Sequence, residues 1–352
     1  MGSQSTGAAW RGFASDNYAG VHPEVLEALS AVNVGHQSAY GDDVVTEQAR
    51  SLVRAHFGAD AEFFPVFNGT GANVVALQSV NQRWQSVICA ASAHIHVDEG
   101  GAPESVAGLK LWTVPTADGK LRPDDVQGQC FDMEFVHRAQ PGAVSITQSS
   151  EMGTVYSPDE VSALAEVAHA NNLAFHMDGA RLSNAAASLH MPVRAFTVDA
   201  GVDLVSFGLT KNGAMAAESV IVLNGDRVQG VDFLRKTSMQ LASKMRFLSA
   251  QFVAMLTDDL WLRSAGHANA MASRLHDGVA DLSGVTITQS VDANAIFVLL
   301  PEQIASRLQE QFHFYTWDQA TGEVRWMCAW DTTESDVDDF VAAVRGEIAS
   351  SA

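Results

Sequence analysis

Short apolar runs alternate with amphipathic segments along the first two thirds of the chain. The apolar runs predict buried strands at residues 63–67, 86–91, 111–114, 143–147, 173–177, 204–209 and 219–223. Helical spacing of apolar positions predicts helices at 23–29, 45–57, 74–80 and 158–171. The last helix is preceded by a capping box, Ser157 to Glu160, with proline at the first helical position. This alternation predicts a mostly parallel sheet covered by helices, with ligands at its carboxyl edge.

The pattern changes after residue 223. Long helical patterns dominate residues 233–262, and the chain from Asp277 onward predicts a helix, a strand, a helix, two strands and a closing helix. The strands are expected at 295–300, 312–317 and 323–330, the second helix at 303–311 and the closing one from about 335. We therefore expect three parts, an N-terminal tail (1–12), a large ligand-binding α/β domain (13–240) and a small C-terminal α+β domain (241–352).

Composition narrows the class of protein. Of 352 residues, 47% are hydrophobic and 18% charged, which is typical of a globular enzyme. No apolar run reaches membrane-spanning length and the first residues lack a signal-peptide core, so we expect a cytoplasmic protein. The three cysteines are too few and too far apart for a disulfide framework or a zinc cluster. A net charge of −20 disfavours nucleic acid and anionic membranes as partners.

An acid and a base follow two of the predicted strands. The run 173–177 ends on Asp178, with Arg181 close behind, and the run 204–209 is followed by Lys211. Open α/β sheets bind ligands at the carboxyl ends of their strands, so these three side chains are the first site candidates. Desolvation disfavours the ammonium form of a lysine, which makes Lys211 available as a nucleophile toward a carbonyl. A Schiff-base lysine and an acidic partner for the ring nitrogen are what a pyridoxal phosphate (PLP) site requires.

A glycine-rich turn supplies a candidate phosphate site. The strand 63–67 runs into Asn68-Gly69-Thr70-Gly71-Ala72-Asn73 and then a helix. Glycines let the backbone turn tightly, so that free amides at the helix start can point at a phosphate while Thr70 adds a hydroxyl. Taken singly, a lysine is usually a surface residue and an Asp-Gly pair an ordinary turn. Taken with this loop, Asp178 and Lys211 predict a PLP site.

Two histidines follow the strand 86–91. On a continuing strand His94 and His96 would share a face, and with Glu99 they could ligate a metal. Alternatively, His94 ends the strand and lies flat over a planar cofactor, and His96 is a structural histidine. A metal-dependent hydrolase built on these side chains is the rival function of another class, but it leaves Asp178 and Lys211 without a role.

Two further segments carry candidate ligand contacts. Ser15 and Asp16 form either a helix-entry turn or a ligand contact. Arg325, on a predicted strand beside Trp326, either faces solvent or binds a carboxylate through two guanidinium nitrogens. The residues alone leave both pairs of alternatives open.

These motifs together resemble the low-specificity threonine aldolases, within the PLP-dependent β-eliminating lyase group. The resemblance spans nearly the whole chain, and it is carried by Ser15-Asp16, Tyr40-Gly41-Asp42-Asp43, Asn68 to Asn73, His94 with Glu99-Gly100-Gly101, His176 to Leu182 and Lys211-Asn212-Gly213. It implies a fold-type I PLP enzyme, usually a homotetramer with active sites at subunit interfaces, that releases glycine and an aldehyde from a β-hydroxy-α-amino acid. Another PLP lyase or an aminotransferase on the same fold is the alternative.

The resemblance also implies roles for individual residues. Lys211 would carry PLP, Asp178 would contact its pyridine nitrogen, and His94 would stack on its ring. Gly69 and Thr70 would bind the phosphate. The substrate carboxylate would be bound by Ser15, Arg181 and Arg325, and no metal is implied.

One segment departs from the family pattern. Many threonine aldolases carry a histidine in the segment that matches residues 147–151, whereas this chain has Ser150 and Glu151 there. This departure implies, as an alternative to threonine, a preference for bulkier β-hydroxy amino acids such as phenylserine. Because removal of the hydroxyl proton needs an acceptor within hydrogen-bond reach, we expect His94 or His96 to take it, directly or through a water.

Overall fold

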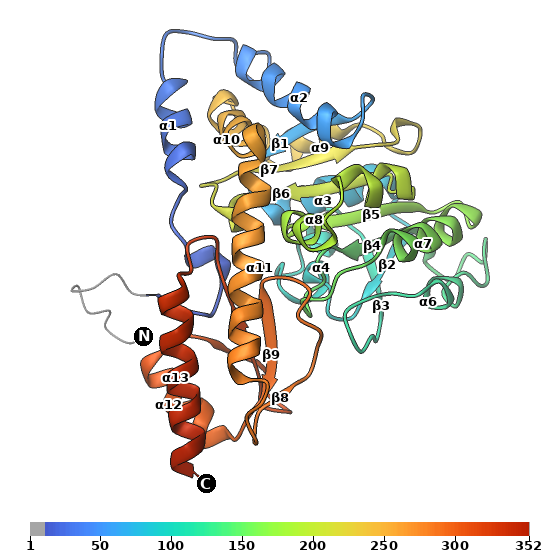
Figure 1. Ribbon diagram of the computed structural model, residues 1–352. Coiled ribbons are helices and arrows are strands. Elements are labelled where there is room, and N and C mark those ends of the chain that lie inside the picture. Colours follow the sequence, from blue (N-terminus) through green and yellow to red (C-terminus); the bar gives the residue numbers. More distant parts are fainter. Residues whose placement is uncertain (1–10, 352) are drawn as a thin grey trace.

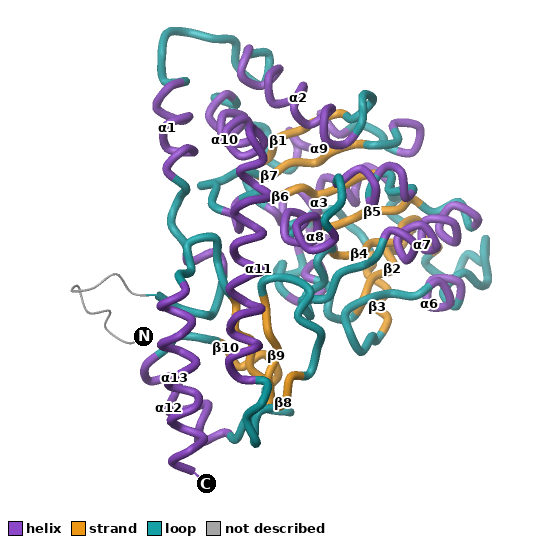
Figure 2. Tube along the Cα trace, in the orientation of Figure 1, coloured by secondary structure: helices purple, strands orange, loops and turns teal. Residues whose placement is uncertain are grey.

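A seven-stranded sheet forms the centre of the larger part of the molecule (Figures 1 and 2). The computed structural model describes residues 11–351, so most of the predicted tail lies outside the described residues. Within this range the strand order is β1-β7-β6-β5-β4-β2-β3, and only β7 runs against the others. The strands are β1 (Glu62–Val66), β2 (Gln85–Ala90), β3 (Lys110–Val114), β4 (Gln140–Thr147), β5 (Ala174–Gly179), β6 (Leu204–Gly208) and β7 (Glu218–Val222). The predicted mostly parallel sheet is confirmed.

Helices cover both faces of this sheet because successive side chains of a strand point to opposite faces. On one face lie α3 (Gly69–Val80) and α9 (Val231–Thr237), whose apolar side chains pack with Leu204 and Val220. The other face, where Val205 and Phe207 point, is covered by α2 (Val44–Phe57), α7 (Pro158–Ala170), α8 (Leu182–Leu189) and α10 (Arg246–Leu256). The sheet is therefore the middle of three layers, and its edges remain for a ligand.

A second sheet of four antiparallel strands, ordered β10-β11-β9-β8, forms the smaller part of the described chain. Its strands are β8 (Thr286–Ile287), β9 (Ala295–Leu299), β10 (Tyr315–Asp318) and β11 (Glu323–Met327). It packs with α12 (Glu302–Gln311), α13 (Glu334–Ser351) and the second half of α11 (Leu260–Val279) around Trp326 and Phe340. The smaller α+β part was predicted from the sequence.

The long helix α11 joins the two parts (Figure 1). Its start, Leu260 and Trp261, belongs to the core of the large sheet, whereas Leu275 and Val279 belong to the core of the small one. Phe13, from the beginning of the described chain, also packs in the small core. Residues from both sides of the predicted domain boundary near residue 240 therefore share each hydrophobic core. The boundary itself stays a prediction.

Two local predictions differ from the structure. The helix expected from residue 74 begins at Gly69, because the Asn68 side chain accepts a hydrogen bond from the Gly71 amide at 2.7 Å and caps the helix there. The strand β2 ends at Ala90, and residues His94–Val97 form the short helix α4. Side chains two apart on a helix point in different directions, so the alternative in which a continuing strand places His94 and His96 on one face is wrong.

The remaining helices are α1 (Pro23–Ala31), α5 (Ala102–Ser105) and α6 (Pro123–Gln127). Two 3₁₀ turns also position site residues, η1 (Asp16–Tyr18) and η4 (Thr210–Asn212). Among residues 11–351 we find no helix whose length and apolar character would let it span a membrane.

Candidate active site

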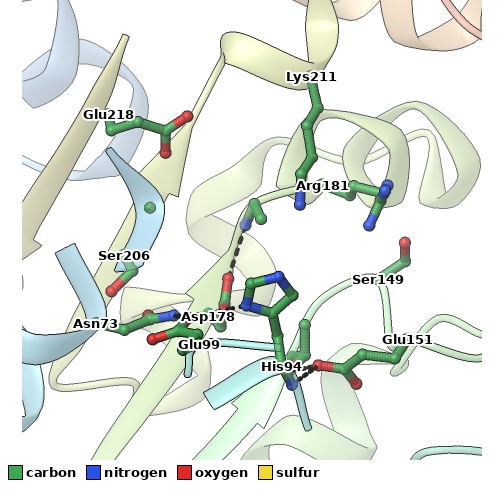
Figure 3. Close-up of a pocket in the computed structure, with 13 residues that line it drawn as sticks. Asn73, His94, Glu99, Ser149, Glu151, Asp178, Arg181, Ser206, Lys211 and Glu218 are labelled. Carbon is green, nitrogen blue, oxygen red and sulfur yellow. Dashed lines mark hydrogen bonds and ion pairs between the residues drawn. The ribbon is translucent and has the colours of Figure 1, made fainter. Parts of the chain in front are cut away.

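A cavity lies at the carboxyl edge of the large sheet, where β4, β5 and β6 end and α3 begins (Figure 3). Its walls include most of the charged residues singled out in the sequence. The lining residues are Gly69, Asn73, His94, Glu99, Thr147, Ser149, Glu151, Asp178, Ala180, Arg181, Ser206, Lys211 and Glu218. Five of the predicted site residues therefore meet there: Gly69, His94, Asp178, Arg181 and Lys211.

Lys211 projects into the cavity from η4, three residues beyond the end of β6 at Gly208 (Figure 3). Burial lowers the pKa of its ammonium group, and the nearby Arg181 guanidinium lowers it further. None of the hydrogen bonds or ion pairs described for residues 11–351 uses its Nζ atom. An amine with a lowered pKa that faces a cavity can act as a nucleophile.

Asp178 lies at the end of β5, on the opposite wall from Lys211 (Figure 3). Its Oδ2 accepts a hydrogen bond from Asn73 Nδ2 at 2.8 Å, and its Oδ1 accepts one from the Ala180 amide at 3.0 Å. These donors stabilise a carboxylate in a fixed orientation, as a partner for a cationic ring nitrogen requires.

His94 belongs to the same hydrogen-bond network. Its Nδ1 lies 2.9 Å from Glu99 Oε1, which also accepts the second Asn73 amide hydrogen at 2.7 Å. The hydrogen bond to Glu99 raises the pKa of His94. Since Glu99 holds one ring nitrogen, the imidazole is fixed in place and its other edge faces the cavity (Figure 3).

The Gly69 end of the cavity combines a helix start with a carboxylate. Gly69 lines the cavity, whereas Thr70, next on α3, is not among the lining residues. The backbone N–H groups of the first helical turn have no partner within the helix and attract anions. Opposite them lies Glu218, whose pKa is raised to about 7 by burial. This acid had no place in the sequence prediction.

Glu151 and Ser149 form the wall near His94. Glu151 Oε1 accepts hydrogen bonds from the His94 amide at 2.8 Å and from Thr147 Oγ1 at 2.7 Å. Burial raises the pKa of the Glu151 carboxyl. Within the described residues its Oε2 and the Ser149 hydroxyl are buried without a hydrogen-bond partner. Such atoms are uncommon in native proteins and often mark the position of a ligand.

Arg181 already has a carboxylate partner. Its Nε and Nη2 donate to the two oxygens of Asp16 at 2.7 and 2.9 Å; Asp16 is buried and Arg181 is partly buried. Ser15 caps η1 by accepting from the Asn17 amide at 3.2 Å and does not line the cavity. Its helix-entry alternative is thus observed. Only Nη1 of Arg181 remains for a further acceptor.

Arg325 lies on β11, outside the cavity lining but close enough to Arg181 for their charges to interact. It donates to the Ala14 carbonyl at 3.0 Å and lies over the Trp317 ring. Burial lowers its pKa to about 10, and its Nε has no partner among the described residues. Arg325 is half-buried, so it does not simply face solvent, and it binds no carboxylate among the described residues. Neither alternative from the sequence analysis is therefore established.

His96 is exposed and lies outside the cavity lining. Residues 11–351 contain no group of three or more histidine, cysteine, aspartate or glutamate side chains placed to hold a metal ion. The hydrolase alternative depended on His94, His96 and Glu99 sharing one face, and the helix α4 separates the two histidines.

The sequence reasoning missed Asn73 and Glu218. Asn73 was part of the glycine-rich motif, but the helix was predicted to start only at residue 74. In the structure Asn73 lies on the helix, one turn beyond Gly69. Asn68, a residue type that often caps helices, was the signal for the earlier start. Glu218, an acid directly before the apolar run Ser219–Val222, was also a signal of a functional residue. Carboxylates are rarely buried, because burial of an unpaired charge is unfavourable.

The donor set fits PLP. An amine without an ion-pair partner among residues 11–351, a carboxylate held by two donors and a glycine at a helix start surround one cavity. Gly69 leaves open space beside the helix start, since a side chain there would meet only the Glu218 carboxylate.

Comparisons with known proteins agree with this geometry. The family model for beta-eliminating lyases matches residues 12–303. A low specificity L-threonine aldolase of Pseudomonas sp. (strain NCIMB 10558) is 43% identical over 95% of this chain and 96% of its own. One of Escherichia coli (strain K12) is 26% identical over 81% of this chain and 83% of its own. A solved threonine aldolase of Leishmania major matches with a TM-score of 0.90 at 27% identity, covering 96% of this chain and 99% of that one. The predicted fold class is confirmed.

Proposed function

The chain belongs to the β-eliminating lyase family, and on that premise we propose that it is a PLP-dependent aldolase. It cleaves L-threonine, L-allo-threonine or a related β-hydroxy-α-amino acid to glycine and an aldehyde. The observation that carries the proposal is the buried Lys211 amine, which faces the same cavity as Asp178. The same lysine and aspartate would serve another PLP lyase or an aminotransferase, and the 43% identity to a threonine aldolase favours the aldolase.

Different cavity residues would bind different parts of PLP. Lys211 would bond to its aldehyde carbon, Asp178 would pair with its ring nitrogen, and His94 would stack on its ring. Gly69 and Thr70, at the start of α3, would bind the phosphate. When bound, PLP supplies the electron sink that accepts the electrons of the broken Cα–Cβ bond.

The Arg181 side of the cavity orients the substrate. Asp16 fixes the Arg181 guanidinium, and the free Nη1 binds the substrate carboxylate with help from Arg325 and Ser15. A carboxylate bound there sets which Cα bond is aligned for cleavage. Asp16 therefore acts as a positioning residue, because it fixes the arginine without contacting the substrate.

His94 removes the proton of the substrate hydroxyl in this proposal. Its Nδ1 is held by Glu99, and the other edge of the ring faces the cavity. Exposed His96 is no longer favoured. Glu151 is the rival acceptor, because it lies in the segment where many threonine aldolases have a histidine and its Oε2 is unpartnered. The space beside Ser149 is where a bulkier substrate side chain, such as that of phenylserine, extends.

We further propose a cytoplasmic homotetramer with active sites at subunit interfaces. Cys89, Cys130 and Cys328 are all free, as is usual in a reducing compartment. Phe67, which directly precedes the Gly69 turn, is 46% exposed, and Met239 is 75% exposed. A partner subunit would cover these apolar side chains. Light scattering should give a mass four times 37.6 kDa, and a monomeric mass in the active protein would contradict the assembly.

The function is tested by incubating the purified protein and PLP with L-threonine, L-allo-threonine and phenylserine, and measuring glycine and aldehyde. Borohydride reduction followed by peptide mapping should place the phosphopyridoxyl group on Lys211. A label on Lys236 or Lys244, or keto acid in place of aldehyde, would refute the proposal.

The hydroxyl base is tested by comparing His94→Asn, His96→Asn and Glu151→Gln. A lost general base costs roughly 10²- to 10⁴-fold in turnover, and we expect that loss for His94→Asn only. All three variants should retain the visible absorbance of bound PLP. Full activity of His94→Asn with an inactive Glu151→Gln would assign the proton to the carboxylate.

A further inference from the structure

Glu218 occupies the place where three strands and a helix start converge. It is the first residue of β7, and its backbone pairs with Val66 of β1 on one side and Gly208 of β6 on the other. The strand β1 leads into the Gly69 turn, and β6 leads to Lys211. The Glu218 residue is only 8% exposed.

The carboxylate of Glu218 points into the cavity (Figure 3). It lies over Gly208, where any side chain would collide with it, and its Oε2 is 3.7 Å from the position that a Cβ on Gly69 would take. The acid therefore lies beside the helix start of α3. In the cofactor arrangement proposed above, the phosphate binds at the same helix start.

Two anions at one buried helix start repel each other strongly, because the surroundings screen charge poorly. A neutral carboxylic acid removes the repulsion and adds an O–H donor that a phosphate oxygen can accept. We propose that Glu218 is part of the phosphate subsite, that it takes up one proton from solvent when PLP binds, and that the resulting acid donates a hydrogen bond to the phosphate.

The charged neighbours of Glu218 are compatible with this step. Thr210 donates to the carboxylate, and Lys211 on η4 attracts it, whereas Asp178 on β5 repels it. The first turn of α3 carries neither an acidic nor a basic side chain. Burial raises the pKa of Glu218 to about 7, so the proton is available near neutral pH.

The inference rests on the proposed use of PLP and is tested on protein freed of cofactor. PLP and pyridoxal, which lacks the phosphate, are titrated into wild type and Glu218→Gln from pH 6 to 9. The amide keeps a donor but cannot ionise. For a group with a pKa of about 7, the variant should bind PLP about tenfold more tightly than wild type at pH 8, and equally at pH 6. Pyridoxal should bind both proteins equally.

A second measurement does not depend on the variant. Calorimetry of wild type at pH 8, in buffers that differ in ionisation enthalpy, should show about one more proton taken up with PLP than with pyridoxal, after correction for the ionisation of the phosphate itself. Glu62→Gln, which neutralises an exposed acid at the far end of the neighbouring strand β1, is the matched control and should behave as wild type.

The outcomes separate this inference from the function it rests on. If wild type fails to bind PLP, the proposed function and this role of Glu218 both fall. If wild type binds PLP but Glu218→Gln binds it no more tightly at pH 8, only the role of Glu218 falls. An equal gain for pyridoxal would also overturn it, because Glu218 would then act through Lys211 rather than through the phosphate.

Discussion

Two buried carboxylates, Asp178 and Glu218, face one cavity from strands of one sheet, but their surroundings differ. Asp178 accepts hydrogen bonds from Asn73 and from the Ala180 amide. Glu218 lies over Gly208 with Thr210 as its donor, and burial raises its pKa to about 7. The sheet edge thus positions both acids, and we attribute the roles proposed above, a fixed charge for Asp178 and a proton carrier for Glu218, to the different surroundings of each acid.

Replacing Asp178 tests the fixed charge and should have the largest effect. The variant Asp178→Asn keeps the shape and one acceptor but removes the negative charge opposite the ring nitrogen. We expect PLP to remain bound and turnover to fall by roughly 3–4 kcal/mol of transition-state stabilisation, about 10²- to 10³-fold, as for other preorganised groups. Aldehyde release and visible absorbance measure the two quantities.

The control for this variant is Asp199→Asn, since Asp199 is an exposed acid paired with Arg194 outside the cavity. It should leave turnover unchanged. Wild-type turnover in Asp178→Asn would show that the charge of Asp178 is not needed, and the comparison with Glu218 would then lose its basis.

Replacing Glu218 tests the proton carrier through the stability of the cofactor-free protein. The folded pKa of about 7 lies above the ordinary value of 4.5, so the folded state keeps a proton that the unfolded chain releases. The free energy of unfolding therefore falls as pH rises from about 4.5 to 7, and the penalty is complete above that window. Glu218→Gln should match wild type at pH 4, below that window, and exceed it by about 3 kcal/mol at pH 8.

Urea unfolding of both proteins at the two pH values measures this difference. Glu62→Gln again serves as the exposed control, with no expected pH-dependent gain. If Glu218→Gln is less stable than wild type at pH 8, the ionised carboxylate is stabilised in the fold and cannot be the group that takes up a proton.

The two acids also differ in whether the sequence analysis identified them: Asp178 was predicted as a site residue and Glu218 was not. Asp178 and Lys211 follow apolar runs, and the rule that ligands gather at the carboxyl ends of parallel strands was enough to place them. The same kind of apolar run predicted all seven strands of the large sheet. Glu218 begins β7, the antiparallel strand, so that rule did not reach it.

Other misses came from contacts distant in sequence. Asp16 and Arg181 are 165 positions apart, and nothing in the local pattern shows that they pair. The alternative that placed His94 and His96 on one face needed the strand 86–91 to continue, but β2 ends at Ala90. Hydrophobic spacing predicts elements and faces, whereas ion pairs and turn ends depend on tertiary packing.

Replacing Asn73 removes one of the hydrogen-bond donors that distinguish Asp178 from Glu218. We expect this change to have the smallest effect of the three replacements. The Asn73 amide donates one hydrogen to Asp178 and the other to Glu99. The apolar variant Asn73→Leu removes both donors and excludes water from their place. Hydrogen bonds to charged groups contribute about 1.5–3 kcal/mol, but the Ala180 amide still donates to Asp178. We therefore expect turnover to fall by about tenfold, less than in Asp178→Asn.

A stability loss alone would not identify this positioning role, so two further measurements are needed. Asn81→Leu, which removes a buried amide bound only to the Leu77 carbonyl at 2.8 Å, should lower stability without lowering turnover of the folded enzyme. If Asn73 acts through Asp178, the double variant Asn73→Leu/Asp178→Asn should lose little more turnover than Asp178→Asn alone, because residues in one network are not additive. Additive losses would mean that Asn73 acts elsewhere, through Glu99 and His94, and the donors of Asp178 would then not explain why it differs from Glu218.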